Sequence, residues 1–295
     1  MEFLRPASWD EALAAKAAHP DALPVCGGTD VMVELNLDLR RPPALLDLTR
    51  VAELTTWSDD GAMVRLGAAV PYSRIIAELS GPLPGLALAA RTVGSPQIRN
   101  RGSVGGNLGA ASPAGDAHPA LLAAGREAAV EAASVRGTRL IPIDAFFTGV
   151  KRNALADDEL IRAVRIPVAD GPQQFAKVGP RNAMVIAVCA FGLALHPRTG
   201  TVGTGIGSAA PTPRRAVEAE EYLRGEFAGR GLWEGGGALD AGLVRRFGEL
   251  VAAAAAPIDD VRGSAAYRRH ALAVIARRTL TWAWNDHRRQ IRSAA

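Results

Sequence analysis

The sequence predicts an α+β fold divided between two units, and three observations support this prediction. The chain has 295 residues, and roughly one domain per 150 residues favours two units. Short apolar runs alternate with helical patterns as far as about residue 168. After that point, three extended segments are followed mainly by helices. Asp170-Gly171-Pro172 is the best linker signal, so we predict domains at 1–170 and 173–295.

The first unit is expected to contain two subdomains, at about residues 1–55 and 56–170. Helices are predicted where apolar residues recur at helical spacing, at residues 9–18, 72–79, 86–91 and 120–125. Short or alternating apolar runs predict strands at residues 23–26, 44–48, 63–69, 128–132, 139–143 and 162–168.

The second unit begins with extended segments and ends with helices. The extended segments are residues 174–178, 183–195 and 202–208. The helices are predicted at residues 215–223, 241–255 and 264–289. Within the third extended segment, residues 203–207 resemble a dinucleotide-binding fingerprint. No glycine follows at the required step and prolines come next, so we interpret this segment as a glycine-rich strand.

Composition and charge exclude several classes of protein. The 34 basic and 30 acidic residues leave a formal charge of +4, too small an excess to favour nucleic-acid binding. The two cysteines cannot form a disulfide framework or hold an iron–sulfur cluster by themselves, and the five histidines lack metal-ligand spacing. The first residues lack the pattern of a signal peptide, and the longest apolar run is too short to span a bilayer. We therefore expect a cytoplasmic protein without a membrane span or a metal site.

Two glycine-rich segments carry the strongest chemical signal. The first is Gly27-Gly28-Thr29-Asp30, and the second is residues 94–109, which contains Gly105-Gly106-Asn107. Glycine removes the side chain that would keep a ligand away from the backbone, and successive N–H groups can then bind a phosphate. Asn107, Ser112 and Asp116 would add directional polar groups, and Asp116 is suited to ribose hydroxyls.

A structural interpretation of these segments stays open on the residues alone. A Gly-Gly pair is more often a turn than a ligand site. A long loop rich in polar residues is harder to dismiss, because such loops in compact domains are usually functional. Residue chemistry therefore leaves a nucleotide site and a structural loop about equally supported.

The chain resembles the FAD-binding medium subunits of the molybdenum hydroxylases, the family of xanthine dehydrogenase and aerobic carbon monoxide dehydrogenase. The second glycine-rich segment carries most of this resemblance, since residues 94–107 match the family pattern almost throughout. The other matching segments are residues 27–30, 111–116, 119–122, 146–149, 155–160 and 210–213. The resemblance implies a PCMH/vanillyl-alcohol-oxidase-like FAD-binding domain of two α/β subdomains. It also implies a C-terminal α+β domain with a short antiparallel sheet and helices.

The resemblance also implies which residues bind FAD. They are Gly27, Gly28, Thr29, Asp30, Ser103, Val104, Gly105, Gly106, Asn107, Ser112, Asp116, Ile161 and Lys177. The two glycine-rich segments would face the pyrophosphate. Ser112 and Asp116 would hold the ribose on the adenosine side, whereas Ile161 would lie near the flavin ring.

Lys177 is also expected near the flavin ring, where its ammonium would stabilise reduced anionic flavin. The alternative is an ordinary surface lysine. Some relatives carry a tyrosine after this lysine that packs on the ring. The corresponding stretch here contains Asn182, so the residue that covers the ring stays open.

The resemblance implies an oxidoreductase subunit that transfers electrons without an acid–base residue of its own. Its partners would be a small [2Fe-2S] subunit and a large molybdopterin subunit in a heteromeric complex. The final electron acceptor would be NAD, a quinone or oxygen. Two alternatives are a stand-alone FAD-dependent oxidase or dehydrogenase of a small molecule, and an assembly subunit that has lost flavin. The arginines of the last helix either face solvent or contact an acidic partner subunit.

Overall fold

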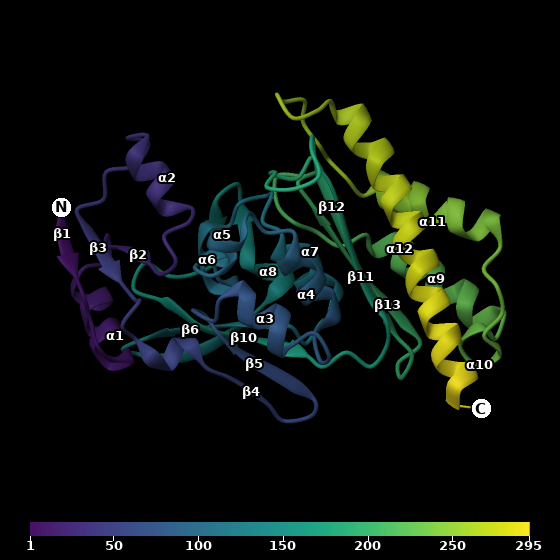
Figure 1. Cartoon of the computed structure of the whole chain (residues 1–295), viewed down its shortest axis with the longest axis horizontal. Helices are drawn as coiled ribbons and strands as arrows, with labels where there is room; N and C mark the ends of the chain where they lie inside the picture. Colours follow the sequence, from purple (N-terminus) through teal and green to yellow (C-terminus); the bar gives the residue numbers. More distant parts are fainter. Residues whose placement is uncertain (295) are drawn as a thin grey trace.

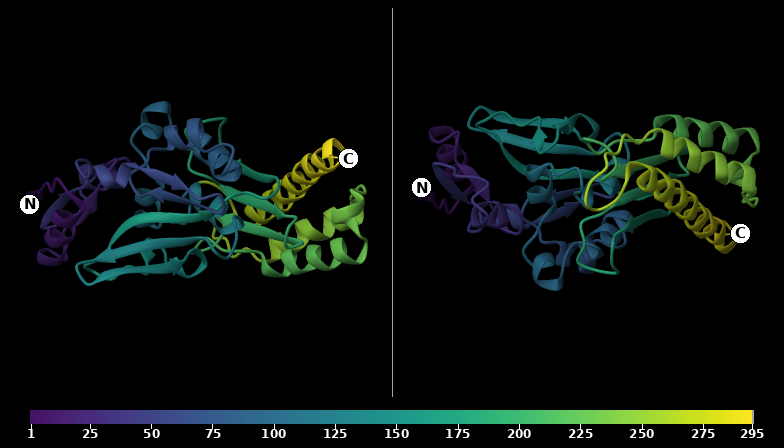
Figure 2. Two further views of the ribbon diagram at one scale, coloured as in Figure 1. Left: turned by 90° about the horizontal axis from the view of Figure 1, so that it is seen from below. Right: turned by 90° about the horizontal axis from the view of Figure 1, so that it is seen from above.

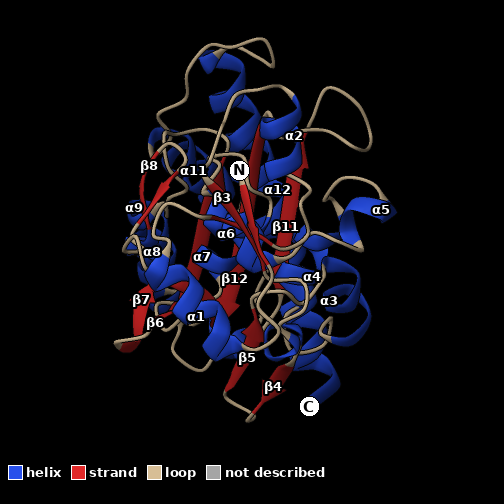
Figure 3. Cartoon of the chain, turned by 90° about the vertical axis from the view of Figure 1, so that its left-hand side faces the viewer, coloured by secondary structure: helices blue, strands red, loops and turns tan. Residues whose placement is uncertain are grey.

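The computed structural model describes residues 1–294 and shows an elongated molecule, with the two ends of the chain at opposite ends (Figures 1 and 2). A three-stranded sheet near the N-terminus is followed by a five-stranded sheet and then by a second three-stranded sheet. Figure 3 views this arrangement with the N-terminus toward the viewer. The mixture of helices with mainly antiparallel sheets agrees with the predicted α+β class.

The first sheet is parallel and has the order β1-β3-β2. Its strands are β1 (Glu2–Leu4), β2 (Leu23–Val25) and β3 (Ala44–Asp47). Helix α1 (Trp9–Ala18) begins at Ser8, whose hydroxyl accepts the N–H of Glu11 at 3.2 Å. Helix α2 (Val31–Asn36) follows the first glycine-rich segment directly. The sequence predicted α1, β2 and β3 but neither β1 nor α2.

The second sheet is antiparallel and has the order β4-β5-β10-β6-β7. Its strands are β4 (Trp57–Asp59), β5 (Met63–Gly67), β10 (Leu160–Pro167), β6 (Ala129–Ser134) and β7 (Gly137–Pro142). The surrounding short elements are η1 (Ala52–Thr55), α3 (Tyr72–Glu78), α4 (Pro84–Arg91), α7 (Ala117–Ala123), α8 (Ile143–Phe146), β8 (Phe147–Gly149) and β9 (Arg152–Asn153). The sequence predicted β5, β6, β7 and β10 but neither β4 nor the β8–β9 hairpin.

A buried carboxylate connects three strands of this sheet. Glu131 on β6 receives two hydrogen bonds from Arg65 on β5, at 3.0 and 2.7 Å, and a third from Arg165 on β10 at 3.4 Å. Its side chain is only 4% exposed. Burial opposes ionisation, but Arg65 and Arg165 outweigh it and hold the pKa of Glu131 below its usual value. The ion pair therefore stabilises the centre of the sheet only while Glu131 is charged.

Glu131→Gln is expected to lower the free energy of unfolding by about 2 kcal/mol at pH 7, because the arginines lose their counter-charge. The pKa of Glu131 is lowered on folding, so its stabilisation is present above the unfolded pKa and is lost as the pH falls through the folded value. Urea unfolding between pH 3 and pH 7 measures this effect. Glu127→Gln, at an exposed carboxylate, is the control. Equal stability of both variants at every pH would contradict the expectation.

The third sheet is antiparallel, has the order β11-β12-β13, and lies between two layers of helices (Figure 1). Its strands are β11 (Gln173–Val178), β12 (Cys189–His196) and β13 (Thr201–Gly207). The helices on one side are α9 (Val217–Gly229), α10 (Leu232–Gly235), α11 (Ala241–Ala253) and α12 (Ala265–Ala294). Helices α4 and α7 of the first unit pack on the other side.

Glycines of this sheet allow α7 to approach closely. A Cβ at Gly205 would lie 2.1 Å from the carbonyl oxygen of Pro119, and one at Gly192 would lie 2.5 Å from the same oxygen. The glycine-rich segment 203–207 is therefore part of a packed strand, as predicted, and is not a nucleotide loop.

Several element boundaries differ from the prediction, among them those of β12, α4 and α9. The apolar run from residue 183 becomes a strand only at Cys189, and the residues before it form a loop. Helix α4 begins at Pro84, which suits the first turn of a helix because it lacks an N–H. Helix α9 continues to Gly229, because apolar side chains such as Phe227 still face the core.

The division at residues 170–172 stays a proposal. It is supported by two separate clusters of buried side chains, one spread over the first two sheets and one between the third sheet and its outer helices. Among the described residues, no helix combines the length and apolar character required to cross a membrane.

Candidate functional site

A cleft of about 1090 Å³ lies where the first unit meets the third sheet. Its walls come mainly from the segment after β2, from residues 93–116, from residues 151–161 and from the loop that joins β11 to β12. The predicted site residues that line it are Gly27, Gly28, Thr29, Asp30, Ser103, Gly105, Gly106, Asn107, Ser112, Asp116 and Ile161. Val104 is buried in the core, and Lys177 lies behind the wall.

The two glycine-rich segments touch each other. A Cβ at Gly27 would lie only 2.1 Å from the carbonyl oxygen of Arg101, so no other residue allows this approach. Gly28 has φ +73°, a conformation that favours glycine. The N–H groups of Gly28, Thr29 and Asp30 form no hydrogen bond with any residue from 1 to 294. The first segment therefore presents free donors to the cleft.

The second segment is not the continuous loop that the sequence predicts. It contains two short helices, α5 (Pro96–Arg99) and α6 (Val104–Ala110). The hydroxyl of Ser103 begins α6 by accepting the N–H of Gly106 at 3.1 Å. The N–H of Gly105 donates to the carbonyl of Ala68 at 3.2 Å. Both glycine amides are thus already paired, so they cannot serve as the free phosphate donors that we expected.

Gly105 and Gly106 of α6 differ in what surrounds them. A Cβ at Gly105 would lie 2.4 Å from the carbonyl oxygen of Ala68, so Gly105 permits close packing of α6 behind the cleft. Gly106 is exposed, and a Cβ there would meet only the hydroxyl of Ser103, at 3.4 Å. Gly106 therefore keeps the cleft surface itself free of a side chain.

Asp116 and Lys177 form a buried ion pair at the inner wall. The Lys177 Nζ lies 2.7 Å from Asp116 Oδ2, and the two side chains are 6% and 11% exposed. Lys177 Nζ also donates to the carbonyl of Thr92 at 3.2 Å. Burial raises the pKa of Asp116 to about 6, even though Lys177 lowers it. Lys177 is therefore not the surface lysine of the alternative interpretation.

Two buried polar atoms at this wall lack a partner among the described residues: Asp116 Oδ1 and the hydroxyl of Tyr72. Burial, and then the charge of Asp116, raise the pKa of Tyr72. A buried polar atom without a hydrogen bond is costly, so a ligand that satisfies both atoms would gain stability there.

The remaining predicted side chains have structural partners as well as a place in the wall. The side-chain oxygen of Asn107 accepts the N–H of Ala117 at 3.3 Å, and the hydroxyl of Ser112 accepts that of Ala114 at 3.3 Å. Ile161 on β10 is 8% exposed and presents an apolar surface.

Sequence reasoning missed several parts of the wall, among them Tyr72 and the loop between β11 and β12. Tyr72 sits in an ordinary amphipathic helix, so its role has no local signal. Met184, Val185 and Ile186 belong to the loop between β11 and β12, and they were assigned to a strand because they are apolar. Only their exposure in the folded chain distinguishes them from core residues.

Comparison with known proteins gives matches along both units. Residues 1–169 match the family model of the FAD binding domain in molybdopterin dehydrogenase. Residues 174–283 match the CO dehydrogenase flavoprotein C-terminal domain. The chain belongs to the family of FAD-binding medium subunits of the molybdenum hydroxylases. The expected family, the fold class and the FAD cofactor are thereby confirmed.

Several relatives of this medium subunit cover nearly its whole length. The nicotine 6-hydroxylase medium subunit of Paenarthrobacter nicotinovorans is 30% identical, over 95% of this chain and 96% of its own. A putative xanthine dehydrogenase FAD-binding subunit of Escherichia coli is 30% identical, over 95% and 94%. In the solved carbon monoxide dehydrogenase of Hydrogenophaga pseudoflava, a chain superposes with a TM-score of 0.87 at 28% identity, over 97% of this chain and 98% of that one.

Proposed function

We propose that FAD lies in the cleft with its pyrophosphate against the segment 27–30. The contact between Gly27 and Arg101 carries this proposal, because it brings the free N–H groups of Gly28, Thr29 and Asp30 beside the start of α6. Successive free N–H groups form a concave donor surface for phosphate oxygens. In this proposal Val104 supports the wall from behind, while Ser103, Gly105, Gly106 and Asn107 line it.

The flavin ring is proposed to lie at the end of the cleft marked by Tyr72, Asp116 and Ile161. A flavin ring carries N–H donors and carbonyl acceptors, which suit the unpartnered Asp116 Oδ1 and Tyr72 hydroxyl. Asp116 pairs with Lys177, so these two residues act at the same part of the ligand. We therefore move Asp116 from the adenosine-side ribose to the ring end, and leave Ser112 as the candidate for the ribose.

We propose that this subunit passes electrons between partners and performs no acid–base step. When bound, FAD supplies the capacity to take up two electrons and to release them singly. The residues of the cleft would bind and orient FAD and exclude water from its buried side. Asp116 and Lys177 would keep one carboxyl group and one ammonium group close to it. The reduction potential of the bound flavin is therefore proposed to depend on the charges of Asp116 and Lys177.

The partners are proposed to be a small [2Fe-2S] subunit and a large molybdopterin subunit. The names of the relatives as medium subunits or medium chains support a multi-subunit complex. NAD, a quinone or oxygen is proposed as the final acceptor. A cytoplasmic location is proposed as well, and the free thiols of Cys26 and Cys189 support it.

The visible spectrum of the purified chain tests the proposal. Wild-type chain is expected to be yellow, or to become so when FAD is added. A chain that stays colourless at saturating FAD would contradict FAD binding. Slow reduction by small-molecule substrates alone, followed by fast reduction once an iron–sulfur partner is added, would support electron transfer. Fast reduction by a substrate without partners would instead support a stand-alone enzyme.

Gly106→Val is expected to weaken FAD binding about tenfold, since it places an isopropyl group on the cleft surface. The fold should be unchanged, because a Cβ at this position has room. Titration of flavin fluorescence measures the affinity. Gly229→Val is the control, since a Cβ there meets nothing within 4 Å and lies at the end of α9. Equal affinity of the two variants would place the ligand elsewhere.

A further inference from the structure

The loop between β11 and β12 gives the cleft an apolar wall. Its residues Met184, Val185 and Ile186 line the cleft. Met184 and Ile186 are 56% and 55% exposed, so both offer apolar surface to a ligand in the cleft. An aromatic ring placed against them would remove this apolar surface from water. In this chain, Met184 and Ile186 are therefore candidates to cover the flavin ring.

Few contacts within the loop hold it in place. Its base is closed by the hydrogen bond from the N–H of Val188 to the carbonyl of Val178, at 2.8 Å. Arg181 donates to the carbonyls of Ala183 and Met184. Because Arg181 belongs to the same loop, these hydrogen bonds do not attach the loop to the rest of the protein. The position of the loop therefore depends on what holds its C-terminal base at Ala187 and Val188.

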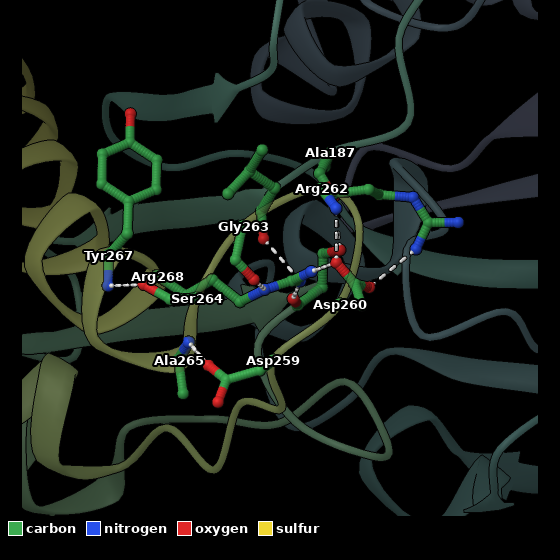
Figure 4. A network of polar contacts seen from close by, with 11 residues as sticks. Ala187, Asp259, Asp260, Arg262, Gly263, Ser264, Ala265, Tyr267 and Arg268 are labelled. Carbon is green, nitrogen blue, oxygen red and sulfur yellow. Dashed lines mark hydrogen bonds and ion pairs between the residues drawn. The ribbon is translucent and has the colours of Figure 1, made fainter.

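A buried arginine from the last helix holds that base (Figure 4). Arg268 lies in the first turn of α12 and is 3% exposed. Its Nη1 donates to the carbonyl of Val188 at 2.8 Å and to that of Ser208 at 2.5 Å. Its Nη2 lies 2.6 Å from Asp260 Oδ1, which orients the guanidinium. One side chain thus connects α12, the end of β13 and the base of the loop.

Ser208 provides a second connection to the same place. Its hydroxyl donates to the carbonyl of Ala187 at 2.5 Å, and its N–H donates to the carbonyl of Pro113 at 2.8 Å. It has φ +60°, a strained conformation for serine that persists only where neighbouring contacts require it. Through Ser208, the loop base is fixed relative to the turn that carries Ser112 and Asp116.

We propose that Arg268 is a positioning residue of the FAD cleft, which holds Ala187 and Val188 so that Met184 and Ile186 lie against the flavin ring. Arg268 itself does not line the cleft. A planar guanidinium with five N–H donors can reach two carbonyls and a carboxylate together, whereas a lysine ammonium cannot match this geometry. The inference rests on the proposed location of FAD.

The test compares the full chain and its variants by FAD titration and by visible circular dichroism of the bound flavin, which reports the surroundings of the ring. Arg268→Gln is expected to weaken FAD binding about tenfold and to change the circular dichroism spectrum. The FAD affinity and the flavin spectrum of Arg268→Lys should lie between those of Arg268→Gln and wild type. Arg269→Gln is the matched control, because the neighbouring arginine is exposed, and it should leave both measurements unchanged.

A double-variant cycle tests whether Arg268 acts through the loop. Met184→Ala alone should weaken FAD binding, but combined with Arg268→Gln it should cause no further loss, because the methionine is already displaced. Losses that multiply in the double variant would show that the two residues act independently, and would overturn the proposal.

Ser208→Ala keeps the test valid if Arg268→Gln fails to fold. It removes only the hydroxyl bond to Ala187 and leaves the contacts of Arg268 in place. We expect the same change in the flavin circular dichroism in a chain that still folds, with a lowered unfolding midpoint because the buried carbonyl of Ala187 loses its hydrogen bond. A wild-type spectrum and affinity in Ser208→Ala, and in Arg268→Gln if it folds, would overturn the inference. Failure of the wild-type chain to bind FAD would instead overturn the proposed function.

Discussion

Lys177→Met is expected to destabilise the FAD-free chain by about 3 kcal/mol at pH 8 and hardly at all at pH 5. The substitution leaves the Asp116 carboxylate buried without its counter-ion, 2.7 Å from the lost Nζ. A buried unpaired charge is among the most costly single changes in a folded protein, and methionine fills a similar volume, so the lost charge dominates the effect.

The pH dependence follows from the direction of the pKa shift. Burial raises the pKa of Asp116 to about 6 in the folded chain, against about 3.9 for an unfolded aspartate. The stabilisation linked to protonation of this group is therefore fully present below the unfolded pKa, and is lost as the pH rises through the folded pKa. Removing Lys177 raises the folded pKa further. The additional loss appears only above pH 6, where the wild-type pair is charged.

Urea unfolding at pH 5 and pH 8 measures the loss in the free energy of unfolding at each pH. The control is the double variant Asp116→Asn with Lys177→Met, which contains neither charge and should recover most of the stability at pH 8. Similar destabilisation by Lys177→Met at the two pH values would contradict the coupling of Lys177 to Asp116. It would show that lost packing, rather than lost charge, is the cause.

The ion pair also shows which parts of the site the sequence could predict. Segments 27–30 and 103–107 are each an unbroken run of residues, so the sequence could mark both as candidates, and the family resemblance then assigned both to FAD. Asp116 and Lys177 are separated by 61 positions. Nothing local in the chain indicates that β11 brings the lysine behind the wall that carries the aspartate. The sequence therefore identified both residues but assigned them to opposite ends of FAD.

Two features of the cleft depend on tertiary contacts even more strongly. Glycines at 105 and 106 predicted an open loop, but capping by Ser103 and packing against Ala68 turn this stretch into a helix. Arg268 looked like one of several solvated arginines of the last helix. Its burial depends on the carbonyls of Val188, just before β12, and of Ser208, just after β13, which only the folded third sheet brings to it.

Gly27→Val is expected to weaken FAD binding about a hundredfold, the largest loss that we expect from a single substitution in the cleft. Its Cβ would lie 2.1 Å from the carbonyl oxygen of Arg101 and 3.1 Å from the N–H nitrogen of Gly102. Neither backbone group can move away as a flexible side chain would, so the two glycine-rich segments must separate. The free donors of segment 27–30 then lose their position relative to α6.

The loss should appear as absence of yellow colour after purification and as a weak fluorescence titration with added FAD. Gly225→Val is the matched control, because a Cβ at this position in α9 meets nothing within 4 Å. Far-ultraviolet circular dichroism should show that both variants keep their helices and strands, since Gly27 is only partly buried and lies outside the helices and strands. If Gly27→Val keeps wild-type affinity, the contact with Arg101 does not shape the binding site, and the pyrophosphate must lie elsewhere.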